Sequence, residues 1–222
     1  MKKKIRLGIN IDHVATLRNA RNEDFPNLID IVKILKKSKV DSVTVHLRED
    51  RRHIKDKDVI EIKKKNILPL NLEMAATKEM KEICIRQKPF ACCIVPERRE
   101  ELTTEGGLDA KGQKNFLGNF LPAILKRGIR TSLFIDPDVQ QIKTAKELGV
   151  NAVELHTGKY ARLFKEGRFE GELRKILLAA KVCSDLGLEC HAGHGLNFLN
   201  VTNISSIPEI SELNIGHFLV AN

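Results

Sequence analysis

Apolar residues recur along the chain with two alternating periods. In eight short segments rich in Val, Ile and Leu they alternate with other residues, as in strands whose side chains point to opposite faces. Between several of these segments they recur every three or four positions, which is typical of amphipathic helices. The predicted strands span 4–10, 42–47, 68–74, 90–97, 130–136, 152–158, 188–195 and 212–221. The predicted helices include 27–39, 56–66, 77–87, 138–149 and 171–187.

This order of elements predicts a parallel sheet that closes on itself. Parallel neighbours need helical crossovers, and eight such units are the number that forms a closed barrel. No linker rich in Pro, Ser or Gly divides the chain. We therefore predict an α/β protein with a TIM (β/α)₈ barrel, and we expect residues 1–222 to be one catalytic domain.

A short internal repeat agrees with closure. The segment VDSVTVH at 40–46 is similar to VNAVELH at 150–156. The two copies lie 110 residues and four predicted strands apart. Four strands are half of an eight-stranded barrel, so the repeat has the spacing of two half-barrels.

Polar residues take one parity in four of the predicted strands. Side chains of that parity face the barrel axis when the apolar ones face the helices. They are Asn10 and Asp12; Thr44, His46 and Arg48; Asn71 and Glu73; and Glu154 and His156. A barrel interior is normally filled with branched apolar side chains, and barrel enzymes act at the carboxyl ends of their strands. The pattern favours an active site there over the alternative, a set of hydrogen-bonded core groups.

Histidines follow the same distribution. All seven lie in or just after predicted strands and none lies in a predicted helix, namely His13, His46, His53, His156, His191, His194 and His217. Imidazoles in such places favour proton transfer or phosphate contact. The His191-x-x-His194 spacing is a poor metal motif, because positions three apart on a strand point to opposite faces. We predict no metal site.

Three kinds of loop add to this site. The segment LREDRRH at 47–53 is strongly basic, although a solvated basic turn would have the same composition. The polar segment 96–113, with Gly106–Gly107, suits a lid that closes over substrate, the alternative being a disordered excursion. Glycines in 193–195 and at 216 would let backbone N–H groups approach an anion, and loops after strands 7 and 8 are the usual phosphate site of barrels.

Composition narrows the function classes. The net charge of +9 comes from lysines scattered over helical segments, so we expect mostly solvated faces that help to attract an anionic substrate. Trp is absent and Tyr occurs once, which argues against a nucleic-acid platform. No apolar run reaches membrane-spanning length, and the basic N-terminus has no apolar segment typical of a signal peptide. Five cysteines without C-x-x-C spacing predict buried thiols and a cytoplasmic location.

Eight ordered blocks of sequence resemble the pyridoxine 5′-phosphate synthase family. They are NIDHVATLRNAR (10–21), TVHLREDRRHI (44–54), NLEMA (71–75), VPERREELTTEGGLD (95–109), SLFID (132–136), ELHTG (154–158), AGHGL (192–196) and ELNIGH (212–217). The blocks run in order across nearly the whole chain and are too long for a chance motif match.

The resemblance implies a barrel enzyme of the transferase class. The family condenses 1-deoxy-D-xylulose 5-phosphate with 3-amino-2-oxopropyl phosphate, giving pyridoxine 5′-phosphate, phosphate and water. It implies a homo-octamer that needs no metal or organic cofactor, and no nucleic-acid or membrane partner. Carried over by motif, the acid–base residues are His46, Glu73 and His194, with Glu154 as transition-state stabiliser. The deoxyxylulose phosphate residues are Asp12, His13, Arg48, His53 and Thr103, and the aminoketone phosphate residues are Asn10, Arg21, Gly195, Gly216 and His217.

The residue types suit that chemistry. Ring closure with dehydration moves several protons, which calls for a carboxylate and histidines. Predicted strands 2 to 8 contain no lysine, so an enzyme Schiff base is not expected. Alternatives from other classes are a metal- or phosphate-dependent barrel isomerase or aldolase, which needs clustered ligands or a barrel lysine, and a basic nucleic-acid-binding domain.

The chain departs from the family pattern twice. His191 stands where the family usually has Asn, so we expect altered hydrogen bonding beside His194. Family members continue past position 222 with an arginine-containing stretch and a closing helix. Without them, we expect the outer residues Leu7, Ile9, Leu213 and Ile215 to lie bare.

Overall fold

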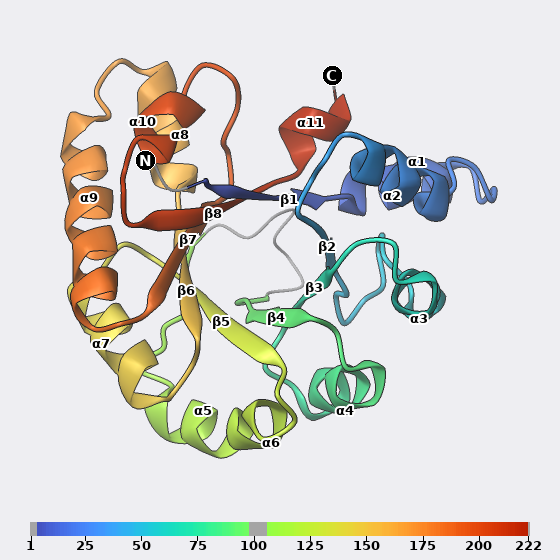
Figure 1. Ribbon diagram of the computed structural model, residues 1–222, viewed down its shortest axis with the longest axis horizontal. Coiled ribbons are helices and arrows are strands. Elements are labelled where there is room, and N and C mark those ends of the chain that lie inside the picture. Colours follow the sequence, from blue (N-terminus) through green and yellow to red (C-terminus); the bar gives the residue numbers. More distant parts are fainter. Residues whose placement is uncertain (1–3, 98–105, 222) are drawn as a thin grey trace.

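The eight strands form one closed parallel barrel. The computed structural model describes residues 4–97 and 106–221. Its strands are β1 (Arg6–Asn10), β2 (Ser42–His46), β3 (Leu70–Met74), β4 (Ala91–Ile94), β5 (Arg130–Ile135), β6 (Ala152–His156), β7 (Glu189–Gly193) and β8 (Ile210–Ile215). Each strand pairs with the next, and β8 pairs with β1 (Figure 1). The predicted (β/α)₈ barrel is confirmed.

Helices surround this barrel (Figure 1). They are α1 (Asp12–Ala20), α2 (Leu28–Lys37), α3 (Asp56–Lys65), α4 (Lys78–Gln87), α5 (Lys114–Phe120), α6 (Pro122–Leu125), α7 (Val139–Glu147), α8 (Gly158–Lys165), α9 (Glu170–Asp185), α10 (Val201–Ser205) and α11 (His217–Ala221). The five predicted helices correspond to α2, α3, α4, α7 and α9. Within residues 4–97 and 106–221, no helix is both long and apolar enough to cross a bilayer.

Two predictions about the ends of strands are wrong. The predicted strand 212–221 ends at Ile215, and His217 begins α11. Pairing of β8 with β1 ends at Ile9–Ile215, because the chain after β1 turns into α1 and leaves no partner for a longer strand. His13 likewise lies in α1, so the histidines are not confined to strands and loops.

The starts of several helices follow from local capping chemistry. The Asn27 side chain accepts a hydrogen bond from the Ile29 amide at the start of α2, and Asp138 accepts from two amides at the start of α7. Such caps satisfy N–H groups that have no partner inside the helix. They hold in place the helices that cover the barrel.

The apolar core lies between the sheet and the helices. Val43 and Val45 on β2 and Leu155 on β6 are fully buried, as are Ile62 of α3 and Ile176 of α9. Each such side chain contributes about 1.5–3 kcal/mol relative to an exposed one. Because the outward parity carries this core, the inward parity is free to hold polar groups.

The repeated segments occupy equivalent places in the two half-barrels. Asp41 before β2 accepts a hydrogen bond from the Leu7 amide on β1 at 2.9 Å. Asn151 before β6 accepts one from the Thr131 amide on β5 at 2.8 Å. In each half-barrel, the residue before the repeated strand therefore accepts a hydrogen bond from the preceding strand, β1 in one half and β5 in the other.

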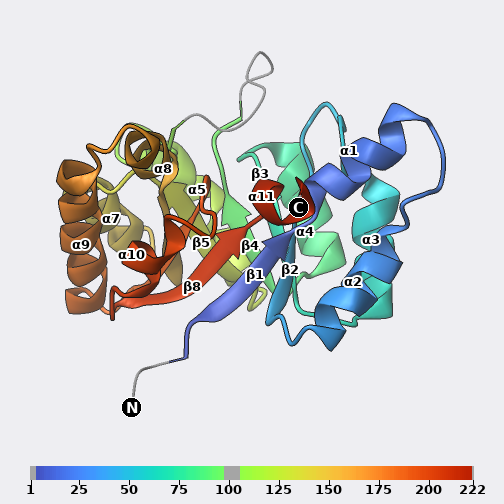
Figure 2. The same ribbon diagram turned by 90° about the horizontal axis from the view of Figure 1, so that it is seen from above.

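The outer face of β1 and β8 is less bare than expected. Ile9 and Leu213 are buried, and Leu7 and Ile215 are half-buried. The expectation is therefore wrong for the first pair, because the core cluster extends across this seam and includes both side chains. Figure 2 shows β1 and β8 crossing the near side of the molecule, with the short helices α10 and α11 beside them.

Candidate active site

The carboxyl ends of β1, β2 and β3 bring predicted site residues together. His46 and Glu73 are neighbours in the β2–β3 register. The Asn10 amide donates to Asp12 Oδ2 at 2.9 Å and to Glu73 Oε2 at 3.3 Å. Asp12 Oδ1 accepts from the His46 backbone N–H at 2.8 Å. These four residues therefore lie together at the barrel mouth, as their parity along the strands predicts.

Asp12, His46 and Glu73 lie close enough to hold a metal ion, with one ligand atom from each within 4.8 Å of the others. Both Asp12 oxygens, however, already accept hydrogen bonds. Burial, with the nearby charges of Glu154 and Asp12, raises the pKa of Glu73 well above its usual range. A protonated carboxyl is a poor metal ligand. The cluster is better suited to exchanging protons.

A second carboxyl lies deeper in the barrel. Glu154 on β6 is buried and accepts a hydrogen bond from the Asn214 amide at 2.8 Å. Burial and the charge of Glu212 raise the pKa of Glu154 to about 8, although the Asn214 hydrogen bond opposes the shift. Thr44 donates to the Asn214 carbonyl at 3.2 Å, so β2 and β8 both fix this carboxyl.

His194 follows β7 on the opposite side of the mouth. Its φ of 81° lies in the left-handed region, which is uncommon for a residue with a side chain and occurs often at functional sites. Burial, together with the charge of His156, lowers the pKa of His194 to about 4. The imidazole is therefore neutral at pH 7 and can accept a proton.

Glu97 is a site residue that the sequence analysis did not single out. Its carboxylate lies 3.4 Å from His46 Nε2 and 3.7 Å from Arg48 Nε, and it accepts a hydrogen bond from the Glu49 amide at 2.9 Å. Burial alone would raise the pKa of Glu97, but the interactions with His46, Glu49 and Arg48 outweigh it and lower the pKa. An ionised carboxylate therefore supports both His46 and Arg48.

Histidines from the two predicted phosphate sites meet at one edge of the mouth. The rings of His13 and His217 lie 4.8 Å apart, edge to face. Burial and His217 lower the pKa of His13. His53 Nδ1 lies 4.0 Å from Asp12 Oδ1. Gly195 follows His194 with a φ of 76°, a left-handed conformation that residues with a side chain rarely adopt.

Among the predicted residues that the structure describes, Arg21 does not join this cluster. Arg21 is exposed at the end of α1 and pairs with Glu23. Thr103 lies outside the described residues, as do all of residues 98–105 of the predicted lid 96–113. The described part of that segment is packed rather than loose: Leu108 and Ala110 are buried, and the Gly107 amide donates to Asp136. Gly216 lies beside Asn10, where an added Cβ would come within 2.9 Å of the Asn10 Cβ.

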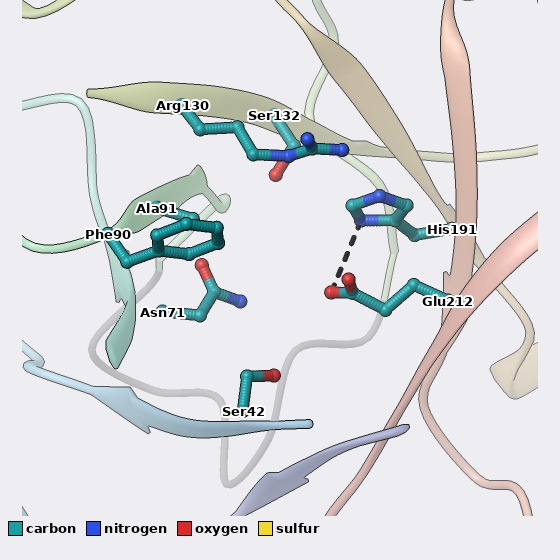
Figure 3. A pocket seen from close by; sticks show the side chains of 8 residues that line it. All are labelled: Ser42, Asn71, Phe90, Ala91, Arg130, Ser132, His191 and Glu212. Carbon is teal, nitrogen blue, oxygen red and sulfur yellow. Dashed lines mark ion pairs between the residues drawn. The ribbon is translucent and has the colours of Figure 1, made fainter. Parts of the chain in front are cut away.

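His191 belongs to a separate polar cluster at the amino-terminal end of the barrel. It lies 3.6 Å from Glu212 and 3.5 Å from Glu189, and Arg6 and Arg130 pair with Glu189 as well. His191 lies within β7 and His194 follows the carboxyl end of that strand, and the expected effect of His191 on hydrogen bonding beside His194 stays a prediction. Figure 3 shows His191 and Glu212 facing Asn71 and Ser42 across the barrel.

This cluster borders a cavity of about 20 Å³. That is room for about one water molecule. Its lining residues come from six strands and the residue before β4, namely Ser42, Asn71, Phe90, Ala91, Arg130, Ser132, His191 and Glu212. The barrel axis is therefore polar at both ends, but only the carboxyl end gathers the predicted catalytic groups.

Few features of the sequence point to the supporting residues. Glu97 stands in a run of charged residues, and Asp136 stands at the end of a strand where a loop begins. Asn214 has the inward parity of β8 and could have been found by extending the parity argument to that strand. The five cysteines were predicted correctly as buried thiols, and all of them are free.

Solved structures with similar folds are barrels of several kinds. The tryptophan synthase A-subunit from Pyrococcus furiosus aligns with a TM-score of 0.61 and 10% identity, over 100% of this chain and 91% of that one. An HpcH/HpaI aldolase from Desulfitobacterium hafniense aligns with a TM-score of 0.63 and 11% identity, over 98% and 88%. At such identities the likeness shows the fold alone.

Curated relatives are much closer in sequence. Pyridoxine 5′-phosphate synthase of Zymomonas mobilis is 53% identical over 99% of this chain and 86% of the relative. Those of Rhodospirillum rubrum and Ehrlichia canis are 50% and 51% identical, over 99% and 97% of this chain and 88% and 89% of the relatives. The family described as pyridoxal phosphate biosynthesis protein PdxJ matches residues 7–222.

The closed barrel and the carboxyls and histidines at its carboxyl end define a (β/α)₈-barrel enzyme with a buried acid–base site. Sequence identities of 50–53% over nearly the whole chain show the family as well as the fold. The chain belongs to the PdxJ family of pyridoxine 5′-phosphate synthases.

Proposed function

We propose that this chain joins 1-deoxy-D-xylulose 5-phosphate and 3-amino-2-oxopropyl phosphate into pyridoxine 5′-phosphate, releasing phosphate and water. The observation that carries the proposal is the convergence of two carboxyls with raised pKa and two histidines at one end of the barrel. Such a set can supply and remove protons repeatedly within one site.

The roles follow the family motifs. Glu73, His46 and His194 act as acids and bases, and Glu154 stabilises charge in the transition state. The proposed deoxyxylulose phosphate residues are Asp12, His13, Arg48, His53 and Thr103. The proposed aminoketone phosphate residues are Asn10, Arg21, Gly195, Gly216 and His217. Arg21 reaches the site in this scheme only if its side chain leaves Glu23, which its exposure permits.

The electrostatics support this division of labour. Glu73 has a raised pKa and so holds a proton that it can deliver to a leaving hydroxyl, after which the carboxylate can act as a base. His194 is neutral at pH 7 and can take a proton from the opposite side. Because the aminoketone brings its own amine, a Schiff base can form between the substrates without an enzyme lysine.

The remaining features of the proposal come from the family resemblance and the composition. We expect one catalytic domain, a homo-octamer, a cytoplasmic location and no metal or organic cofactor. Neither a nucleic acid nor a membrane is an expected partner. Buried free thiols are compatible with a reducing compartment.

The direct test mixes both phosphorylated substrates with the purified chain and follows the absorbance of the pyridine ring. Formation of pyridoxine 5′-phosphate and of one inorganic phosphate per ring supports the proposal. Glu73→Gln serves as the inactive control. Consumption of either substrate alone, with no pyridine product, would instead indicate a different barrel enzyme.

A further inference from the structure

A second histidine, His156, lies directly beside His194. It ends β6, and its side chain is 5% exposed. The two rings are 5.1 Å apart and inclined by 61°. Phe134 of β5 packs against both rings, at 5.1 Å from His156 and 6.5 Å from His194. His156 occupies the position in the second half-barrel that His46 occupies in the first.

A carboxylate orients the His156 ring. His156 Nδ1 lies 3.1 Å from Asp136 Oδ1, just after β5. The hydrogen bond from His156 lowers the pKa of Asp136, although burial opposes the shift, so this carboxylate is ionised. An ionised carboxylate only accepts hydrogen bonds, so His156 Nδ1 must carry the proton. The Gly107 amide also donates to Asp136 Oδ1 at 3.1 Å and holds the carboxylate in place.

The other nitrogen of His156 is buried toward His194. Nε2 has no hydrogen-bond partner among the described residues. A Cβ added to Gly158 would lie 2.5 Å from His156 Nε2 and 2.8 Å from His194 Cδ2. Both rings therefore converge over Gly158, where only a glycine leaves them room. Burying a nitrogen without a hydrogen-bond partner costs free energy, so its presence here calls for a functional explanation.

We propose that Asp136 and His156 form a carboxylate–imidazole pair that positions the ring of His194 and sets its readiness to accept a proton. His156 acts through His194 and is a positioning residue. The role of His194 as an acid–base group rests on the proposed function, whereas its contact with His156 does not.

Electrostatics indicate in which direction His156 shifts the pKa of His194. Burial is the larger cause of the lowered pKa of His194, and the neighbouring His156 lowers it further. The titratable and charged groups around the two rings are Glu154 on β6, Asp136 after β5 and Lys159 in α8, which lies near Asp136. Removing the imidazole of His156 should therefore raise the pKa of His194 from about 4 toward its ordinary value.

The test compares His156→Gln and Asp136→Asn with Asp138→Asn. Asp138 is two residues from Asp136 and caps α7, and asparagine caps a helix about as well as aspartate, so this control removes one charge from the same loop without touching His156. We expect both test variants to lower kcat at least about tenfold with KM changed less than about threefold, as for groups that orient a catalytic side chain. The control should match the wild type.

The decisive readout is the titration of His194 in the free protein, followed by the NMR signals of its ring. A raised pKa of His194 in His156→Gln, with none in Asp138→Asn, supports the pairing even if the wild type fails to make pyridoxine 5′-phosphate, in which case only the proposed function fails. An unchanged titration together with kcat within about twofold of the wild type would overturn the proposal. If His156→Gln does not fold, Asp136→Asn decides, because the Asp136 side chain is 56% exposed and tolerates an isosteric change.

Discussion

At the scale of single residues, the site depends on carboxyls that are placed where they resist ionisation. Glu73 lies close to Asp12 and Glu154 is buried beneath, so ionising all of them would crowd like charges in a region with little water. Glu73 and Glu154 therefore keep their protons to a higher pH than they would in water. That is unfavourable for folding at alkaline pH and useful for acid–base chemistry.

Glu73→Gln should abolish turnover while leaving the fold intact, because the amide has nearly the same shape but cannot exchange the proton. General acid–base catalysis typically contributes 10²–10⁴-fold to the rate. The measurement is product formation under saturating substrates, with circular dichroism as the check on folding. Product formed faster than about one tenth of the wild-type rate would remove Glu73 from this role.

Glu97→Gln should lower kcat and also raise KM, because the carboxylate supports His46 and Arg48 at once. We expect at least about a tenfold fall in kcat/KM, since charged partners of a buried ion contribute more than neutral ones. Glu79→Gln is a matched control, because it removes an exposed carboxylate that pairs with Arg51 near the same mouth. Equal kinetics for the two variants would contradict the prediction.

Parity along the strands predicted Asn10, Asp12, His46, Glu73 and Glu154, because the two-residue period of a strand is a local property. It was not applied to the strands that precede Glu97 and Asp136, which lie past the ends of β4 and β5. Their partners come from other strands, so only the closed barrel brings them together. The family motifs, in contrast, also include Thr103 and Arg21, and the roles of all the motif residues are predictions.

At the scale of elements, α1 was not predicted from the hydrophobic periodicity, although it carries residues of the candidate site. It carries Asp12 and His13, and its short polar sequence has no clear apolar stripe. A buried ion pair fixes it instead: Arg18 donates to both Asp58 oxygens of α3, at 2.7 and 2.8 Å. Long-range pairs of this kind leave no trace in a local sequence pattern. The strand prediction for 212–221 failed for a related reason, because the partner strand ends first.

Arg18→Met should destabilise the protein by about 3–5 kcal/mol, because it leaves the Asp58 carboxylate buried without its partner. The double variant Arg18→Met, Asp58→Asn should recover part of that loss, since no buried charge is then left alone. Chemical denaturation of the two variants and the wild type measures the effect. A double variant less stable than Arg18→Met would contradict this account of α1.

At the scale of the whole molecule, the polar axis makes stability depend on pH. The pKa of Glu154 is about 8 in the folded protein and near 4.5 when unfolded. The folded state therefore binds more protons between these values, so this contribution is present below pH 4.5 and is lost as pH rises through 8. His194, with a pKa lowered to about 4, has the opposite effect: its contribution is present above pH 6.5 and is lost as pH falls through 4.

Glu154→Gln should therefore become more stable relative to the wild type as pH rises from 6.5 to 9, where His194 no longer titrates. We expect the difference in Tm to grow by at least about 3 °C, which is about 1 kcal/mol for a chain of this size. Thermal unfolding at both pH values measures it. A difference that stays constant across this range would show that Glu154 ionises as readily in the folded protein as in water.

The ion pairs of Arg6 have a consequence for how the chain comes together. Arg6 of β1 joins Glu212 of β8 across 206 positions, which spans nearly the whole sequence. During synthesis, one edge of β1 therefore stays unpaired until β8 has emerged from the ribosome. The charged end of β1 discourages mispairing in that interval, since an edge strand carrying a charge is a poor template for aggregation. The same Arg6 side chain therefore has two effects: before β8 is available its charge discourages mispairing of β1, and afterwards it pairs with Glu212 where the barrel closes.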